Sequence, residues 1–324
     1  MDQAIDQAVT LRARYAGRAR DLYPLYLGTL LLTIITLGFY RFWARTRIRR
    51  YIWSRIVVQD DALEYTGTGK ELFIGFLKAA LILSPLLLGY AALDIAAQLD
   101  EALAIYYGAG RVIVYILLLY LFFVGSYAAT RYRLSRTRWR SIRFHQGGSP
   151  WEYGVMAFGG AILRGLTLGF YTPFNDVKLA RYETAHRQFG TAPFGFDGKA
   201  RPLFWPFARC WVLLPFTLGL SWFWYDARRT RYVVEHTVLE SLRFTMSPAV
   251  TGWKMARLKI GNMLIALFTL GLGYPIIVRR SMRFWCDNVS AAGTIDFARI
   301  GQAAALPGSG EGLAGFFNID TLGT

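Results

Sequence analysis

The chain has 324 residues, of which 54% are hydrophobic, 16% aromatic and only 18% charged, and this composition is a poor fit to a soluble globular protein. Its net charge of +16 comes largely from arginines just beyond apolar segments, which favours anionic membrane lipids over nucleic acid as the partner. Two cysteines without a CxxC motif and three histidines without metal-ligand spacing give no support to a disulfide framework, a metal site or a cofactor.

Hydrophobic windows of near-spanning length recur along the chain, since about twenty apolar residues are needed to cross a bilayer. The six windows are residues 22–43, 72–93, 111–129, 153–174, 203–225 and 258–278. The first six residues, Met1 to Asp6, lack the basic region and the cleavage site of a secretory signal, so we expect the first window to be retained. Hydropathy therefore predicts a polytopic membrane protein.

An internal repeat of roughly 50 residues is anchored on the tripeptide Thr-Leu-Gly. The tripeptide occurs at residues 36–38, 167–169, 217–219 and 269–271. Counting from each threonine, position +11 is basic, +14 is arginine and +15 is tyrosine or phenylalanine. A fifth, degenerate copy aligns on Val124 and lacks the tripeptide. The chain is therefore predicted to contain about five copies of one unit.

Short strand patterns follow the basic segment of each copy. Their aromatic residues are Tyr65, Phe196, Phe244 and Phe297, and similar patterns at 13–17 and 142–147 precede the first and fourth windows. Together these features predict an all-α polytopic membrane protein with short β-strand segments between spans. The repeats fill residues 1–298, and a glycine-rich, flexible C-terminal tail is expected over 299–324.

One helical face carries an aromatic residue followed by two cations, because positions +7, +11 and +14 are spaced at i, i+4 and i+7. Such a face suits a helix at the membrane interface whose guanidinium groups bind lipid phosphates or other anions. The alternative interpretation is that the face only anchors the ends of the spans. The candidate lipid-binding or anion-binding residues are Trp43, Arg47, Arg50, Arg181, Trp224, Arg228, Arg231 and Arg283.

Arg164 lies inside an apolar window, where a charge is costly and marks a functional candidate. The alternative is that nearby glycines let it reach backbone carbonyls or a carboxylate of another span. Asp176 and Asp226 share position +9, and we expect them to form ion pairs between copies. The sequence has no convergent nucleophile and base, so an enzyme is not predicted.

The sequence resembles the YjgN-like family of bacterial inner-membrane proteins, domain of unknown function 898. The resemblance rests on the Thr-Leu-Gly-aromatic turn, Trp43 with Arg47, the Arg50-Tyr51 step, and Tyr65-Thr66-Gly67 followed by Lys70-Glu71-Leu72-Phe73. It extends over residues 12–298. It implies a multi-pass protein of the bacterial inner membrane without catalytic residues.

Residues 94–110 carry three acids and no basic residue, so they are predicted to face the non-cytoplasmic side, with 44–71 and 130–152 in the cytoplasm. We favour an arrangement in which all six windows cross. The alternative makes the windows with Thr-Leu-Gly re-entrant and leaves 72–93 and 111–129 as the crossings. The function we predict is binding of a lipid-like or anionic small molecule, with a transporter and a structural or assembly partner in a membrane complex as alternatives.

Overall fold

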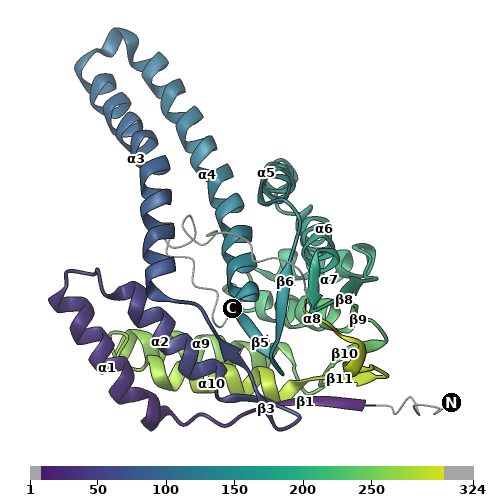
Figure 1. Cartoon of the computed structure of the whole chain (residues 1–324). Coiled ribbons are helices and arrows are strands. Elements are labelled where there is room, and N and C mark those ends of the chain that lie inside the picture. The colour runs from purple at the N-terminus through teal and green to yellow at the C-terminus, as the bar shows by residue number, and fades with distance from the viewer. Residues whose placement is uncertain (1–8, 303–324) are drawn as a thin grey trace.

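The structure is a computed structural model that describes residues 9–302. Its strands form a curved sheet at one end of the molecule, and pairs of helices surround and extend from that sheet (Figure 1). One pair, α3 and α4, projects far beyond all the others (Figure 1). The molecule thus has a compact base and a single long helical arm.

The α-helices of this part of the chain come in pairs, each joined by a short connection. The pairs are α1 (Ala19–Ile35) with α2 (Arg41–Trp53), α3 (Gly69–Leu99) with α4 (Ala104–Ser135), α5 (Pro150–Leu166) with α6 (Thr172–Ala185), α7 (Arg201–Leu213) with α8 (Ser221–Glu235), and α9 (Gly252–Phe268) with α10 (Tyr274–Asn288). Two short 3-10 helices cover Glu101–Leu103 and Phe297–Arg299. Each α-helix contacts the next along the chain and α10 contacts α1, so the helices form a closed ring.

The strands are antiparallel and belong to one sheet. They are β1 (Val9–Tyr15), β2 (Ile56–Val58), β3 (Asp61–Ala62), β4 (Glu64–Tyr65), β5 (Thr137–Trp139), β6 (Ile142–Gln146), β7 (Arg187–Phe189), β8 (Ala192–Phe196), β9 (Thr237–Leu239), β10 (Leu242–Met246) and β11 (Val289–Gly293). Their order is β3-β2-β1-β11-β10-β9-β8-β7-β6-β5-β4. The two end strands, β3 and β4, are separated only by Leu63, so the sheet closes almost completely into a barrel.

Each helix pair is inserted between two strands that pair with each other. The strand before a helix pair bonds to the strand after it, as in β1 with β2, β6 with β7 and β8 with β9. All helix pairs therefore leave the barrel at one end, and tight β-hairpin turns occupy the other. Two of these turns, Gln59-Asp60 and Arg140-Ser141, have positive φ at both residues, as a twisted two-residue hairpin requires.

The Thr-Leu-Gly tripeptide forms the tip of a helical hairpin. The Thr36 hydroxyl donates to the Leu32 carbonyl at 2.7 Å and accepts from the Tyr40 amide at 2.9 Å, so one side chain closes the first helix and caps the second. Leu37 (φ 50°) and Gly38 (φ 92°) are left-handed, which reverses the chain. The same contacts recur at Thr167, Thr217 and Thr269.

The prediction of an all-α polytopic fold with six crossings is wrong. One of these hairpin tips lies inside each of four predicted windows, so none of the four is a continuous spanning helix. The four windows are 22–43, 153–174, 203–225 and 258–278. Within residues 9–302 only α3 and α4, of 31 and 32 residues, are long and apolar enough to cross a membrane. The tip consists of apolar or small residues, and a hydropathy window therefore averages straight across it.

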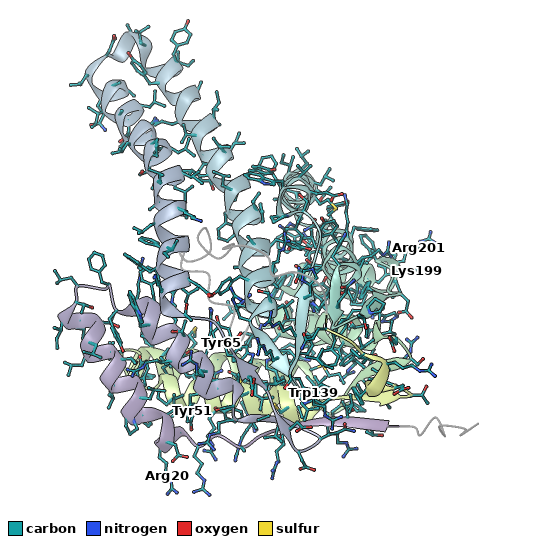
Figure 2. The ribbon with its side chains drawn as sticks, viewed as in Figure 1. Arg20, Tyr51, Tyr65, Trp139, Lys199 and Arg201 are labelled. Carbon is teal, nitrogen blue, oxygen red and sulfur yellow. The ribbon has the colours of Figure 1, made fainter. Side chains whose placement is uncertain are left out.

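The strand predictions have a mixed outcome. As predicted, three of the aromatic residues lie in strands: Tyr65 in β4, Phe196 in β8 and Phe244 in β10. The predicted strand patterns at 13–17 and 142–147 overlap β1 and β6. Phe297 instead lies in a 3-10 helix. Tyr65, where the barrel meets the helices, is 3% exposed, and Trp139, toward the opposite end of the barrel, is 5% exposed, so buried core residues occur at both ends. Figure 2 shows both within the body of the molecule and shows Arg20 and Arg201 at its edges.

Candidate functional site

The arginines at position +14 hold neighbouring helix pairs together. Three of the four donate to a backbone carbonyl just before the next pair begins. The bonds are Arg50 to Gly67 at 3.3 Å, Arg181 to Gly198 at 2.7 Å and Arg231 to Val250 at 2.8 Å. A charged donor on a backbone carbonyl stabilises that turn directly. These three predicted lipid ligands therefore use part of their hydrogen-bonding capacity within the protein.

Near the degenerate copy predicted at Val124, which is second along the chain, one arginine makes the same contact in a different register. Arg131 donates to the Gly148 carbonyl at 3.4 Å, with the spacing of 17 residues that also separates Arg50 from Gly67. Arg131 therefore stands to Gly148 as Arg50 stands to Gly67, seven residues before Arg138, which the alignment on Val124 places at +14. No Thr-Leu-Gly tripeptide lies between α3 and α4, and these two helices continue into the long arm.

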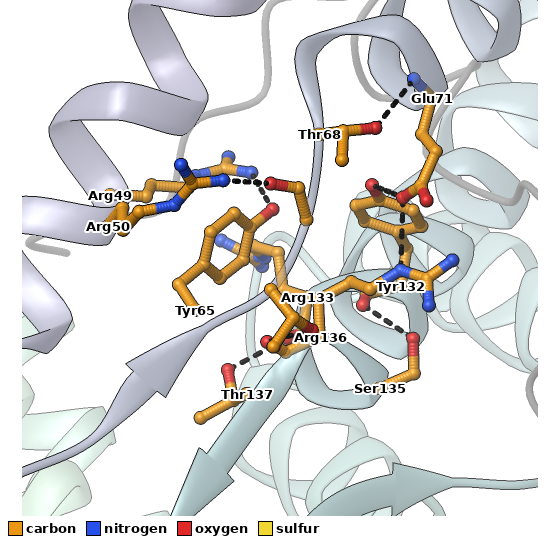
Figure 3. A network of polar contacts seen from close by, with 12 residues as sticks. Arg49, Arg50, Tyr65, Thr68, Glu71, Tyr132, Arg133, Ser135, Arg136 and Thr137 are labelled. Atoms are coloured by element: carbon orange, nitrogen blue, oxygen red, sulfur yellow. Dashed lines mark hydrogen bonds and ion pairs between the residues drawn. The ribbon is translucent and has the colours of Figure 1, made fainter.

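A polar network joins the base of the long arm to the barrel and to α2 (Figure 3). Glu71, in the first turn of α3, accepts from the Tyr132 hydroxyl at 2.5 Å and lies 3.0 Å from Nε of Arg136. On the α2 side, the Arg49 side chain is only 3% exposed and donates to the Tyr65 hydroxyl at 3.3 Å. The network fixes α3 and α4 where they leave the barrel.

A groove of about 760 Å³ lies between α7, α8 and the loop before α9. Three predicted residues, Trp224, Arg228 and Arg231, line it together. Arg209 of α7 is a third arginine of the groove, which the sequence interpretation missed. The remaining walls are mainly apolar or small residues and include Pro206, Cys210, Leu213, Leu220, Pro248 and Val250. Among the described residues that form this groove there is no carboxylate.

The three arginines of the groove differ in the hydrogen bonds that they make within the protein. Arg231 donates to the carbonyls of Pro248 and Val250 at 3.0 and 2.8 Å. Arg209 and Arg228 are exposed, and neither has a carboxylate partner within the part of the chain that the structure describes. An apolar groove with two uncompensated guanidinium groups favours an anionic amphiphile electrostatically.

The other predicted residues are spread around the helix ring. Trp43 packs beside Gly69 and stacks on Tyr40 with ring centroids 6.3 Å apart, and Arg47 donates to the Tyr40 hydroxyl at 2.8 Å. Arg283 is exposed on α10. The eight candidates therefore do not converge on a single site, although three of them line the groove at α7 and α8.

The acids at +9 form the ion pairs that were predicted between copies. Asp176 of α6 lies 2.6 Å from Arg229 of α8, and Asp226 of α8 lies 3.0 Å from Lys259 of α9. Burial raises the pKa of the Asp176 carboxyl, and the positive charges of Arg229 and Arg164 oppose that shift. Residues 9–302 contain no cluster of histidine, cysteine and acidic side chains that could hold a metal ion.

Arg209 had a sequence signal that the interpretation overlooked. It interrupts the apolar window 203–225 in the way that Arg164 interrupts 153–174. An arginine inside an apolar window is a functional candidate by the same physical argument in both cases. Arg209 is connected to the repeated face because it lines the same groove as Arg228.

Comparisons with known proteins identify the family. A family model described as bacterial protein of unknown function (DUF898) matches residues 10–218 and 207–316. A segment of 68 residues is 35% identical to inner membrane protein YjgN of Salmonella typhimurium and covers 21% of this chain but 17% of that relative. No solved structure matches the chain. Because the family model covers most of the sequence, the resemblance is confirmed, and the chain belongs to the bacterial family DUF898.

Proposed function

We propose that this chain is an inner-membrane protein in which α3 and α4 cross the bilayer and the four Thr-Leu-Gly hairpins enter one leaflet. The relative's name supports the location, and the length and apolar surface of α3 and α4 support the crossing. The tips support the leaflet insertion, because Leu37, Leu218 and Leu270 are 90%, 93% and 90% exposed. Large exposed apolar groups at the ends of several hairpins favour a lipid environment over water.

The dimensions and hydrogen bonds of the hairpins suit this arrangement. The first helix of such a hairpin, α1, has 17 residues and is about 25 Å long, which is shorter than the roughly 30 Å hydrocarbon core. Backbone groups at the tip need partners inside lipid. The Gly38 amide donates to the Thr33 carbonyl at 2.7 Å and the Tyr40 amide to the Thr36 hydroxyl, so the turn supplies partners itself.

The recurring order of elements supports the internal repeat of roughly 50 residues. Strand, helix pair and paired strand follow one another through the described chain, and the +14 arginine makes an equivalent contact in four of the copies. In this interpretation the second copy became the membrane-crossing arm when its hairpin lengthened.

The groove between α7 and α8 binds an anionic phospholipid in this proposal. The observation that carries it is the pair of exposed arginines, Arg209 and Arg228, above apolar walls and without a carboxylate. The groove belongs to a hairpin whose tip enters the leaflet, so a lipid headgroup at the interface can meet both guanidinium groups while its chains contact the apolar walls. Trp224, 50% exposed, adds an aromatic side chain of the kind enriched at headgroup depth.

The double variant Arg209→Gln/Arg228→Gln tests this function. Each cation near an anionic surface contributes about 1 kcal/mol, so the double variant is expected to retain phosphatidylglycerol at least about tenfold more weakly. Native mass spectrometry of protein released from mixed phosphatidylglycerol and phosphatidylcholine nanodiscs measures the retained lipid. Arg201→Gln is the matched control, because Arg201 is exposed on α7 and points away from the groove-forming body (Figure 2). Unchanged phosphatidylglycerol retention in the double variant would refute the proposal.

A further inference from the structure

The barrel is hollow. A cavity of about 540 Å³ lies within it, in the range of roughly 300–1,000 Å³ typical of small-molecule sites. The walls come from almost every strand and are strongly apolar. They include Leu11, Val58, Trp139, Phe144, Phe189, Phe194, Leu239, Phe244 and Ala291. Side chains of a well-packed core leave few voids larger than a water molecule, so an interior of this size is suited to a ligand.

One cation faces this apolar interior. Arg187, the first residue of β7, lies on the same face of its strand as Phe189 and lines the cavity near the end from which the helices leave. Its Nη2 lies 3.8 Å from Oε2 of Glu183, and its Nε is buried without a hydrogen-bond partner in the described structure. The described residues that line the cavity include no carboxylate. A guanidinium group in this position is only partly compensated.

The opposite end of the barrel is covered by the chain after β11. Phe297 packs edge-on against Trp139 with ring centroids 5.3 Å apart, and Ile300 is 7% exposed. The Thr191 amide donates to the Gly301 carbonyl at 3.1 Å, which ties this segment to the turn between β7 and β8. The cavity therefore has a closed apolar end and a cationic end directed toward the helices. Residues 299–302 of the predicted tail contribute to this cover, and 303–324 lie outside the described residues.

We propose that the barrel interior binds one long-chain fatty acid, with its carboxylate on Arg187 and its hydrocarbon chain along the aromatic wall formed by Trp139, Phe144 and Phe189. A carboxylate forms a charge-assisted pair with the free Nε edge of the guanidinium group, and the chain removes apolar wall from contact with water. A neutral apolar molecule would fill the cavity but would leave the positive charge of Arg187 only partly compensated. This site is separate from the groove at α7 and α8 and does not depend on lipid binding there.

Fatty-acid titration of the full chain in phosphatidylcholine nanodiscs tests the proposal. A fluorescent polyene fatty acid should bind with one site per chain and be displaced by palmitate, whereas methyl palmitate should compete at least tenfold more weakly. Arg187→Gln should weaken palmitate at least tenfold and leave methyl palmitate unchanged. Arg14→Gln is the matched control, because Arg14 is exposed on the outer face of β1 beside Ala13, and it should behave as the unsubstituted protein.

A second measurement needs no change at Arg187. Cys286 lines the cavity, and burial raises the pKa of its thiol to about 11, so it reacts slowly at neutral pH. In a Cys210→Ala background, palmitate should slow alkylation of Cys286 by an apolar maleimide at least tenfold. No saturable binding, equal competition by the methyl ester, or alkylation of Cys286 that palmitate leaves unchanged would each overturn the proposal.

Discussion

The double variant Leu37→Asp/Leu218→Asp is expected to lower the stability of the membrane-embedded protein by about 5 kcal/mol, because a charge near the bilayer centre costs about 2.5–3.5 kcal/mol per residue. Both side chains are almost fully exposed at hairpin tips and make few protein contacts to lose. If the tips lay in water, the same substitutions would hardly change the stability, since aspartate tolerates a left-handed backbone better than leucine does. Denaturant unfolding in nanodiscs measures the difference.

A matched substitution separates lipid contact from backbone effects. Gln59 has φ 48°, close to the 50° of Leu37, but it lies in a β-hairpin turn at the far end of the barrel. Gln59→Asp should change the unfolding free energy by less than about 0.5 kcal/mol. A tip variant as stable as the Gln59 variant would show that the tips lie in water.

Glu71→Gln is expected to lower the free energy of unfolding by about 2 kcal/mol, because it leaves Arg136 and the Tyr132 hydroxyl without their shared carboxylate. The Arg136 side chain is 18% exposed, so solvent compensates only part of the loss and the effect should depend weakly on salt. Denaturant titration of both proteins at low and high salt gives the value.

The control for this change is Glu64→Gln, which alters an exposed glutamate on the neighbouring strand β4. This substitution should leave the free energy of unfolding nearly unchanged. If Glu71→Gln matched this control, the network in Figure 3 would make no net contribution to fixing the arm.

Periodicity in the sequence located the repeated residues correctly but not their partners. The alignment placed Arg50, Arg181 and Arg231 at one position, and they do share one contact. That contact is a carbonyl of the next helix pair, which comes close only because the strands on both sides of each pair bond to each other. Strands of two to five residues, such as β3 and β6, are too short for a clear period-two pattern, so closure of the barrel was not predicted.

The Thr-Leu-Gly tips show why hydropathy misled the fold prediction. Glycine after an apolar helix is a recognised stop signal, and Gly38 and Gly219 have φ of 92° and 84°. The same tripeptide that recurs along the sequence is therefore a chain reversal within each apolar window. Two helices around a reversal have the same average hydropathy as one long span, so composition alone cannot distinguish them.

In the proposed arrangement, α3 and α4 alone cross the membrane while the hairpin tips end inside one leaflet. Single cysteines in a Cys210→Ala/Cys286→Ala background, labelled with an impermeant maleimide in spheroplasts and in inverted vesicles, test it most directly. We predict that position 100 reacts only from outside the cell, position 240 in a barrel turn only from the cytoplasm, and positions 37, 218 and 270 from neither side. Labelling of position 37, 218 or 270 from either side of the membrane would contradict this arrangement.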